Sequence, residues 1–253
     1  MLMSYVSVEV LENIAKVIMD TGGKYNVIDK QLMYSMIDTF RKLDNEKSVR
    51  FVILTGANKN FGAGADIKEL KLANENREYA IIFFSTMYEM YRTLLNFSKP
   101  IISVVEGVAY GASMELLLVS DIVISSPHSR FAAPGGKIGV LPPVLLTLGK
   151  EILGWDTVKK LALLGEELSA DEAKEVGLVH YISENLEEEG RKVIEKLKQM
   201  APSSLTNMRK ILYSKYEKEL EDAFKILIEQ AVSPDATIGV LACLTKTKPP
   251  WAN

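Results

Sequence analysis

The chain has 253 residues, 47% of them hydrophobic, which is enough for a sizeable core in one large domain or in a domain with an extension. Its 30 basic and 33 acidic residues give a net charge of −3, and no run of basic residues stands out, so nucleic-acid binding is disfavoured. The single cysteine, Cys243, excludes an internal disulfide framework, and no apolar segment approaches the roughly 18 residues of a membrane span, so we expect a cytoplasmic protein that is not membrane-bound.

The first half of the chain predicts alternating strands and helices. Short hydrophobic runs predict strands, and apolar residues recurring at helical spacing predict helices. The expected strands lie at 6–10, 14–19, 51–54 and 101–105, and the expected helices at 29–43 and 79–94. A Gly/Asn-rich loop occupies 55–65, and Asp66 is placed to cap a further helix.

The second half begins with a predicted strand at 122–125 and a loop rich in proline and glycine at 131–143. A helix follows at 157–164, and the segment 169–172 has the pattern of a capping box that starts a helix ending at Gly177. The last predicted strand is 179–182. After about residue 185 the pattern is helical only, with Pro202 and Pro234 separating the segments. The predicted architecture is therefore an α/β region followed by a helical tail.

The segment 106–118, EGVAYGASMELLL, is the most informative part of the chain. It opens with small residues and continues as an apolar helix whose first turn contains Glu115. A carboxyl group among methionine and leucine side chains is at least partly desolvated, so it must be paired, protonated or functional. The small residues before it free backbone N–H groups at a helix start, where negative charge is favoured. An acid/base group beside such amides suits an enzyme that handles an oxyanion and a proton together.

Several motifs, in this order along the chain, resemble the crotonase superfamily, which is also called the enoyl-CoA hydratase/isomerase superfamily. They are FGAGADIKE at 61–69, KPII at 99–102, GVAYGA at 107–112, EL at 115–116 with SDI at 120–122, SADEA at 169–173 with GLV at 177–179, and KTKP at 246–249. The resemblance covers essentially the whole chain. It implies an α/β fold in which strand–strand–helix units form a right-handed spiral with a C-terminal helical region.

The same resemblance implies two parts, a spiral acyl-CoA-binding core at 1–190 and a C-terminal helical region at 191–253 that takes part in trimerisation. Family members form trimers or dimers of trimers, so a homotrimer or homohexamer is expected. The implied substrate is an acyl-CoA thioester. Coenzyme A is then part of the substrate, and we expect no separate cofactor and no metal.

By motif position, the resemblance assigns catalytic roles to Ala65, Ala112 and Glu115. The backbone N–H groups of the two alanines would bind the thioester oxygen and stabilise the enolate that forms when charge moves onto it. Members often have glycine at the position of Ala112, but alanine still offers its N–H. Glu115 matches the first of two glutamates that flank the substrate double bond in hydratases, where it handles the water at the β-carbon.

The resemblance also implies where the coenzyme A portion binds. The family places adenine against the loop that matches Ala63, Asp66 and Ile67. Lys24 lies in the loop that approaches the pantetheine and the phosphates, and Lys248 lies at the basic C-terminal end. A solvated surface position is the alternative for each lysine.

The second glutamate of the hydratases is missing from this chain. In the family it follows a proline in a Phe-x-x-Pro-Glu segment, whereas Pro134 is followed here by Gly135. That glutamate delivers or removes the α-carbon proton. Three accounts remain open: Glu115 works alone, an acidic side chain folds in from elsewhere, or the oxyanion hole serves a different acyl-CoA reaction. Lys137 lies nearby and is interpreted as a solvated loop lysine.

A serine hydrolase is an alternative from a different class. The segment 111–115, GASME, nearly matches the G-x-S-x-G nucleophile elbow, but Glu115 occupies the last glycine position. Ser113 would also need His128 or His180 as its base, and both histidines are interpreted as structural.

A dinucleotide-binding protein and a protein without catalytic activity are two further alternatives. A GAG motif at 62–64 resembles a dinucleotide fingerprint, but Ile67 occupies its third glycine position. A protein that kept the fold and lost catalysis is credible because of the missing glutamate, and tight binding of a CoA ester without turnover would support it.

The sequence therefore predicts an acyl-CoA enzyme of the enoyl-CoA hydratase type. It would add water to a 2-enoyl-CoA or remove water from a 3-hydroxyacyl-CoA through an enolate. An enoyl-CoA isomerase, or another acyl-CoA enzyme with a single glutamate, is the close alternative.

Overall fold

The structure, a computed structural model, describes residues 5–252 and contains a six-stranded and a three-stranded sheet. The large sheet has the order β1 (Val6–Leu11), β2 (Ile14–Met19), β3 (Phe51–Gly56), β4 (Ile101–Val105), β6 (Ile122–Ser125) and β9 (Tyr181–Ile182). β1 and β2 form an antiparallel hairpin, and each later strand is parallel to its neighbour. The small sheet joins β5 (Val108–Tyr110), β7 (Arg130–Ala132) and β8 (Glu167–Ser169). The chain thus advances in one direction across the large sheet.

The helices follow the predicted caps. Asp29 and Asp66 accept hydrogen bonds from the N–H groups of Leu32 and Lys68 at 2.7 and 2.9 Å, and the predicted capping box at Ser169 is present. The helices are α1 (Lys30–Asn45), α2 (Ile67–Glu75), α3 (Arg77–Leu95), α4 (Ala112–Leu118), α5 (Lys150–Ile152), α6 (Trp155–Lys159), α7 (Ala170–Glu175), α8 (Leu186–Lys198), α9 (Pro202–Tyr213), α10 (Glu217–Ala231) and α11 (Pro234–Thr245). Shorter 3₁₀ or π segments include Pro134–Ile138, Leu145–Gly149 and Lys160–Leu164.

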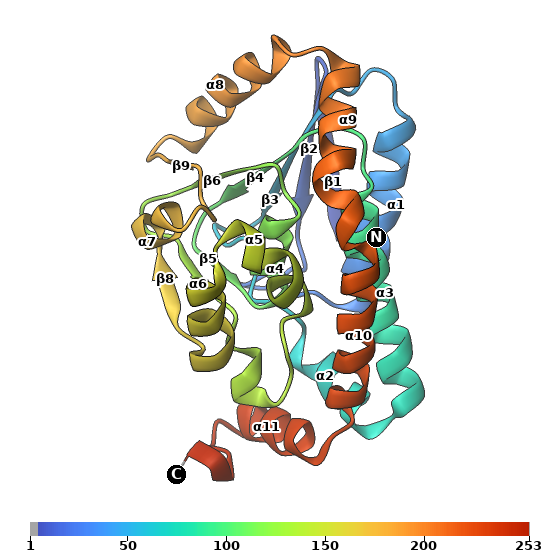
Figure 1. Cartoon of the computed structure of the whole chain (residues 1–253), viewed down its shortest axis with the longest axis vertical. Coiled ribbons are helices and arrows are strands. Elements are labelled where there is room, and N and C mark those ends of the chain that lie inside the picture. The colour runs from blue at the N-terminus through green and yellow to red at the C-terminus, as the bar shows by residue number, and fades with distance from the viewer. Residues whose placement is uncertain (1–4, 253) are drawn as a thin grey trace.

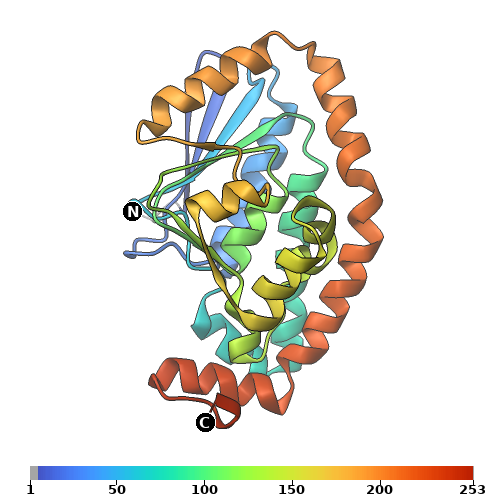
Figure 2. The same ribbon diagram turned by 60° about the vertical axis from the view of Figure 1, so that its left-hand side comes forward.

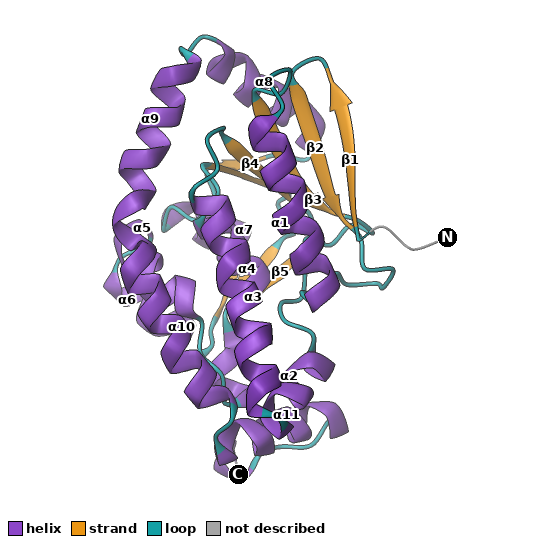
Figure 3. Cartoon of the chain, turned by 90° about the vertical axis from the view of Figure 1, so that its right-hand side faces the viewer, coloured by secondary structure: helices purple, strands orange, loops and turns teal. Residues whose placement is uncertain are grey.

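Different helices cover the two faces of the large sheet. Because side chains alternate along a strand, Ile101 of β4 packs in the main core with α1 and α3, whereas Ile102 packs in a smaller cluster with Val193 and Ile194 of α8. Figure 3 shows α1 and α3 between the sheet and α10. Figure 1 and Figure 2 show α9 and α10 running nearly end to end along one side of the molecule, with α11 turning beneath it.

A buried ion pair fastens α9 to the rest of the protein. Arg209 donates from Nη1 to Asp121 Oδ2 at 2.6 Å, and its other N–H groups reach the carbonyl oxygens of Leu94 and Phe97 at 2.9 and 3.0 Å. Asp121 also accepts a hydrogen bond from the Ile101 N–H at 2.7 Å. Burial raises the pKa of Asp121, and Arg209 opposes that rise. The C-terminal helical region is therefore joined to the start of β4 and to the end of α3.

The structure corrects some of the predicted elements. The strand expected at 179–182 is only Tyr181–Ile182, because the N–H groups of Leu178 and Val179 bond instead to the Ala173 carbonyl and close the end of α7. The expected loop at 131–143 contains part of β7 and a 3₁₀ turn. The three-residue strands β5 and β8 are too short to show a periodic pattern. Residue 190 lies inside α8, and the two-part division at this position stays a prediction.

None of the helices within residues 5–252 is, taken singly, both long enough and apolar enough to cross a membrane. One bent pair, Pro202–Ala231 with Pro234–Thr245, passes that test by length and composition only, with a bend of 73°.

Replacing Arg209 by alanine should lower the free energy of unfolding by about 3–5 kcal/mol, because Asp121 would stay buried without its cationic partner. Urea denaturation followed by circular dichroism measures this loss. Arg77→Ala is the matched control, because it removes an exposed ion pair with Glu229 and should leave the urea midpoint nearly unchanged. Equally small changes in both variants would contradict the role given to Arg209.

Candidate active site

Glu115 lies in the interior of the protein, in the first turn of α4. This helix begins directly after Gly111, whose φ of +51° turns the chain sharply from β5 into the helix. All residues of α4 are buried, and Glu115 is only 2% exposed. The prediction that the apolar run desolvates this carboxyl group is confirmed.

The carboxyl group of Glu115 meets the start of a second helix. Its Oε1 accepts hydrogen bonds from the N–H groups of Val144 and Leu145 at 2.6 and 2.8 Å. These two residues follow Pro143 at the beginning of a helical segment, where free N–H groups and the helix dipole favour negative charge. Oε2 has no hydrogen-bond partner among residues 5–252. The two oxygens of Glu115 therefore have different surroundings, one anchored and one available.

Two opposing effects set the acidity of Glu115. Burial raises its pKa from the ordinary 4.5 to about 8, although the hydrogen bonds from Leu145 and Val144 lower it. A group with a pKa near neutrality both gives and takes a proton readily. Tyr91 lies close by: its hydroxyl donates to the Ala112 carbonyl at 2.6 Å, and burial together with the charge of Glu115 raises its pKa. Tyr91 therefore stays neutral beside the carboxyl group.

Ala65 lies on a loop that packs closely against the start of α4, whose first residue is Ala112. A Cβ atom built on Gly64 would lie 2.8 Å from the Tyr110 carbonyl oxygen and 3.3 Å from the Ala112 nitrogen. Gly64 also has a φ of +89°, a conformation that other residues rarely adopt. A glycine next to Ala65 thus permits its loop to approach the start of α4.

Hydrogen bonds orient the N–H groups of both alanines. In a trans peptide the C=O of one residue points opposite to the N–H of the next. The Gly64 carbonyl accepts from the Ile28 N–H at 2.8 Å, so the Ala65 N–H points away from Ile28. The Gly111 carbonyl accepts from the Glu115 N–H at 3.1 Å, so the Ala112 N–H points out of the start of α4. Within the described chain neither of these N–H groups has an acceptor, and both are free for a ligand oxygen.

Gly135 lies in the 3₁₀ turn Pro134–Ile138 and packs against Val140. A Cβ built on it would be 3.0 Å from the Val140 carbonyl oxygen and 3.3 Å from Val140 Cγ2, so a glutamate here would require Val140 to move. The pKa of Glu115 responds to burial and to two backbone amides, with no contribution from another charged group of the described chain. Within residues 5–252 no second acidic side chain bonds to Glu115, whose hydrogen bonds come from the amides of Val144 and Leu145.

The residues predicted to hold coenzyme A fall into two places. The exposed Ala63 donates its N–H at 2.7 Å to the loop that carries Lys24, Asp66 caps α2, and Ile67 packs partly against the core. The loop of Ala63 and Ala65, the start of α2 and the loop of Lys24 are therefore neighbours. Lys248 is exposed beyond α11 and makes no hydrogen bond or ion pair with them in the described chain. Residues from two separate segments would therefore have to meet the same coenzyme A.

The arrangement does not support a serine hydrolase. Ser113 Oγ accepts a hydrogen bond from the Gly64 N–H at 3.1 Å, and within residues 5–252 no histidine bonds to it. His180 Nδ1 instead accepts from the Val123 N–H at 3.0 Å, and burial lowers its pKa. Ser113 therefore has no base to activate it.

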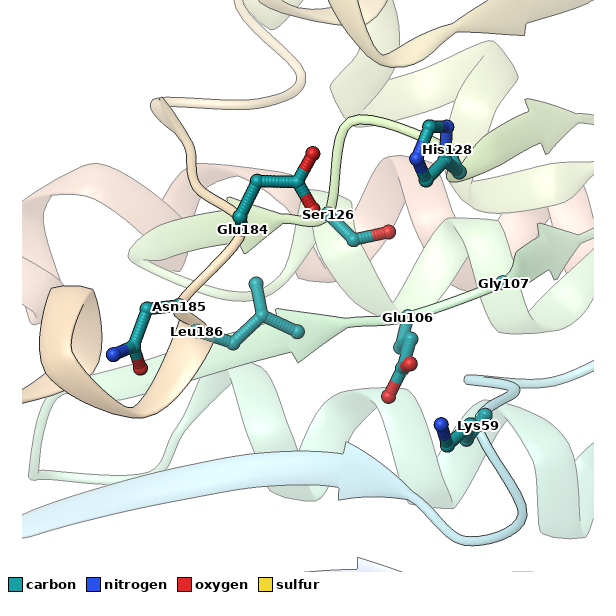
Figure 4. A pocket seen from close by; sticks show the side chains of 8 residues that line it. All are labelled: Lys59, Glu106, Gly107, Ser126, His128, Glu184, Asn185 and Leu186. Atoms are coloured by element: carbon teal, nitrogen blue, oxygen red, sulfur yellow. The ribbon is translucent and has the colours of Figure 1, made fainter.

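A separate hollow of about 680 Å³ lies at the carboxyl ends of β3, β4, β6 and β9. Figure 4 shows its lining, which includes Lys59, Glu106, His128 and Glu184 and none of the predicted site residues. A mixture of one lysine, one histidine and two glutamates selects no particular ligand charge. Among residues 5–252 no group of histidine, cysteine, aspartate and glutamate is suited to hold a metal ion.

The sequence does not predict the two amides that hold Glu115, although it contains a signal for them. Pro142 and Pro143 precede an apolar run, and proline favours the first position of a helix, so a helix start was readable there. No such signal links Tyr91 to Ala112, because their bond joins segments that only the tertiary fold brings together.

Fold and geometry together define an α/β protein with a buried carboxyl group one helical turn from a backbone N–H that has no acceptor in the described chain. The sequence model of the enoyl-CoA hydratase/isomerase family matches residues 9–253, and the chain belongs to this family, as its motifs predicted.

Individual relatives agree with this assignment and with the predicted crotonase fold. Carnitinyl-CoA dehydratase of Escherichia coli (strain K12) is 29% identical over 241 residues, which cover 90% of this chain and 91% of that protein. An enoyl-CoA hydratase/isomerase structure from Mycobacterium paratuberculosis matches with a TM-score of 0.87 at 19% identity, covering 94% of this chain and 98% of that one. Methylmalonyl-CoA decarboxylase in complex with 2-nitronate-propionyl-CoA matches with a TM-score of 0.84 at 26% identity, covering 97% of each chain.

Glu115→Gln should remove a pH dependence from the stability of the fold. The folded protein holds a proton on Glu115 up to a pKa of about 8, whereas the unfolded chain releases it near 4.5. The wild type should thus lose stability as the pH rises between these values, by up to about 4–5 kcal/mol at roughly 1.4 kcal/mol per pKa unit. Glutamine still accepts from both amides but carries no charge.

Urea denaturation of both proteins at several pH values between about 5 and 8.5 tests this linkage. The stability difference in favour of the glutamine variant should widen as the pH rises. Parallel profiles would show that Glu115 is not desolvated as described.

Proposed function

We propose that the protein is a hydratase-type enzyme that reversibly adds water to a 2-enoyl-CoA to give a 3-hydroxyacyl-CoA. The observation that carries this proposal is the buried carboxyl group of Glu115, which lies within one helical turn of the free N–H of Ala112. In this proposal the N–H groups of Ala65 and Ala112 bind the thioester oxygen, and Glu115 moves the proton.

One carboxyl group is sufficient for the proton transfers of dehydration. Ionised Glu115 removes the proton from Cα of the 3-hydroxyacyl-CoA, and the electron pair moves onto the thioester oxygen, where two N–H groups stabilise the negative charge. When the enolate collapses, the Cα–Cβ double bond forms and the Cβ–O bond breaks. Glu115 then gives its proton to the departing hydroxyl, which leaves as water, and the carboxylate is regenerated. Hydration is the same sequence in reverse.

The hydrogen bonds that hold Glu115 suit a carboxyl group that first removes a proton and then returns it. Oε1 is occupied by the amides of Val144 and Leu145, so Oε2 would carry the proton in each step. Its pKa, raised to about 8 by burial, makes the carboxylate a stronger base than an exposed one and keeps its conjugate acid available at neutral pH.

The named relatives support a reaction on a CoA ester. The name of the carnitinyl-CoA dehydratases, 29% identical to this chain, describes removal of water from such an ester. The alternative of an inactive CoA-ester-binding protein is less well supported, because a buried carboxyl group whose ionised form has no cationic partner among the described residues costs stability and has a clear use in proton transfer.

An enoyl-CoA isomerase is the second candidate, and Gly135 favours it. Shifting a double bond requires removal of a proton from one carbon and its return to another, which a single carboxyl group does without a water molecule. Supplying a 2-enoyl-CoA and a 3-enoyl-CoA separates the two activities. Consumption of only the 3-enoyl ester would favour the isomerase, and consumption of the 2-enoyl ester with formation of a 3-hydroxyacyl-CoA would favour the hydratase.

The proposal also covers how coenzyme A is bound, which cofactors are needed and where the protein is located. The adenine end of coenzyme A would lie on the loop of Ala63, Asp66 and Ile67, with Lys24 and Lys248 as partners for phosphate groups. Coenzyme A is part of the substrate, so the reaction would need no other cofactor. A cytoplasmic location remains a prediction from the composition.

Glu115→Gln should reduce kcat by about 10²–10⁴-fold, because the amide side chain neither takes nor gives the transferred proton. The Kd for a 2-enoyl-CoA, measured by isothermal titration calorimetry, should change little. Glu75→Gln, which alters an exposed glutamate paired with Lys71, is the matched control and should keep full activity. A glutamine variant with wild-type kcat would overturn the proposed role of Glu115.

The family resemblance leads us to expect a homotrimer or homohexamer. Within the described residues, Trp155, Leu163, Ile211 and Leu212 are each more than half exposed and are available for contacts between copies of the chain. Light scattering after size-exclusion chromatography should give about 84 or 169 kDa, three or six times the chain mass of 28.1 kDa. A mass near 28 kDa at micromolar concentration would contradict the expected assembly.

A further inference from the structure

Ser113 links the loop that carries Ala65 to the start of α4, which carries Ala112. Ser113 is 1% exposed, and its Oγ accepts a hydrogen bond from the Gly64 N–H at 3.1 Å. Gly64 directly precedes Ala65, and Ser113 directly follows Ala112. This single hydrogen bond therefore joins the immediate neighbours of both proposed oxyanion donors.

The backbone of Gly62 leaves the space that Ser113 occupies. A Cβ built on Gly62 would lie 2.3 Å from Ser113 Oγ and 2.9 Å from Ser113 Cβ, so any side chain at position 62 would displace the hydroxyl group. Gly62 also donates its N–H to the Val108 carbonyl and accepts from the Tyr110 N–H, both at 2.9 Å. Two backbone bonds thus hold the loop along β5, and Ser113 holds the residue just before the donor.

Gly64 needs this restraint because it has no side chain to limit its rotation. Its carbonyl is held by the Ile28 N–H at 2.8 Å on one side, and its own N–H is held by Ser113 on the other. Of these two restraints, only the bond to Ser113 comes from α4, the helix that also carries Ala112 and Glu115. The Ser113 hydroxyl group is therefore the restraint that ties Gly64, the residue just before one donor, to the helix that carries the other donor.

We propose that Ser113 is a positioning residue, which fixes the distance and relative orientation of the Ala65 and Ala112 amides so that both reach one thioester oxygen. This inference rests on the proposed function. A displacement of about 1 Å at a reacting centre costs about 10²-fold in rate, so a lost loop contact is sufficient to affect catalysis.

The test is Ser113→Ala, which removes the hydroxyl group and leaves the Gly64 N–H without its acceptor. We expect kcat to fall roughly 10- to 100-fold while KM stays within about threefold, because substrate binding along coenzyme A is unaffected and only the transition-state contact is weakened. If Ser113 only stabilised the fold, the variant would contain less folded enzyme and unfold at a lower temperature. The molecules that remain folded would still polarise the thioester carbonyl as the wild type does.

A spectroscopic probe reports directly how strongly the site polarises a bound thioester carbonyl. The thioester 4-(dimethylamino)cinnamoyl-CoA absorbs at longer wavelength when hydrogen-bond donors polarise its carbonyl group. Wild-type protein should shift this band to the red, and Ser113→Ala should give a clearly smaller shift at saturating probe. If Ser113→Ala does not fold, Gly62→Ala serves instead, because its new methyl group displaces the hydroxyl and should reduce the shift in the same way.

Ser103→Ala is the matched control. Ser103 is also fully buried, and its hydroxyl group bonds at 2.8 Å to Ser120 Oγ, not to Gly64 or another neighbour of the donor amides. This variant should keep the wild-type red shift and kcat.

The outcomes separate the inference from the proposed function. If the wild type neither shifts the probe nor converts 2-enoyl-, 3-hydroxyacyl- or 3-enoyl-CoA esters, the proposed function fails. If the wild type does both and Ser113→Ala matches it in kcat and in red shift, the positioning role fails and the proposed function stands.

Discussion

The site depends on an ionisable group that is held out of water without being neutralised by an opposite charge. Burial of Glu115 raises its pKa, the amides of Val144 and Leu145 lower it, and the balance lies at about 8. Burial without the amides would leave a carboxylic acid that rarely ionises, and amides without burial would leave a weak base. The helix start after Pro143 therefore controls the chemistry of a side chain 29 residues earlier in the sequence.

The remaining parts of the proposed site are backbone atoms, so their positions depend on how chain segments are held. Ala65 and Ala112 would contribute only N–H groups, and these are oriented by the bonds that Ile28 and the first turn of α4 make to neighbouring carbonyls. Close approach of the Ala65 loop to the start of α4 requires glycine at position 64. β3 leads into the loop of Ala65, and β5, which follows β4, leads into α4. A parallel bridge between Gly62 and Ala109 of β5 brings these segments, far apart in sequence, side by side. Strand pairing therefore sets the relative positions of the two backbone segments that carry the proposed N–H donors.

The elements that carry a local sequence pattern were predicted correctly. The caps at Asp29 and Asp66, the strand Ile101–Val105 and the buried carboxyl group in α4 follow from periodicity, capping chemistry and the cost of burying charge. It missed β5 and β8, because three residues contain no period, and it missed the partners of Glu115, Tyr91 and Arg209, because those bonds join distant segments. The substitution at Gly135 was visible in the sequence, but its consequence, a site with one carboxyl group, required the surrounding structure.

The most direct test is a structure of the protein with a bound, unreactive acyl-CoA analogue. The account predicts that the thioester oxygen lies about 2.7–3.1 Å from both the Ala65 and the Ala112 nitrogen atoms, with Glu115 Oε2 facing the α- and β-carbons. A thioester oxygen that reaches neither amide, or an acyl chain that lies away from Glu115, would contradict it.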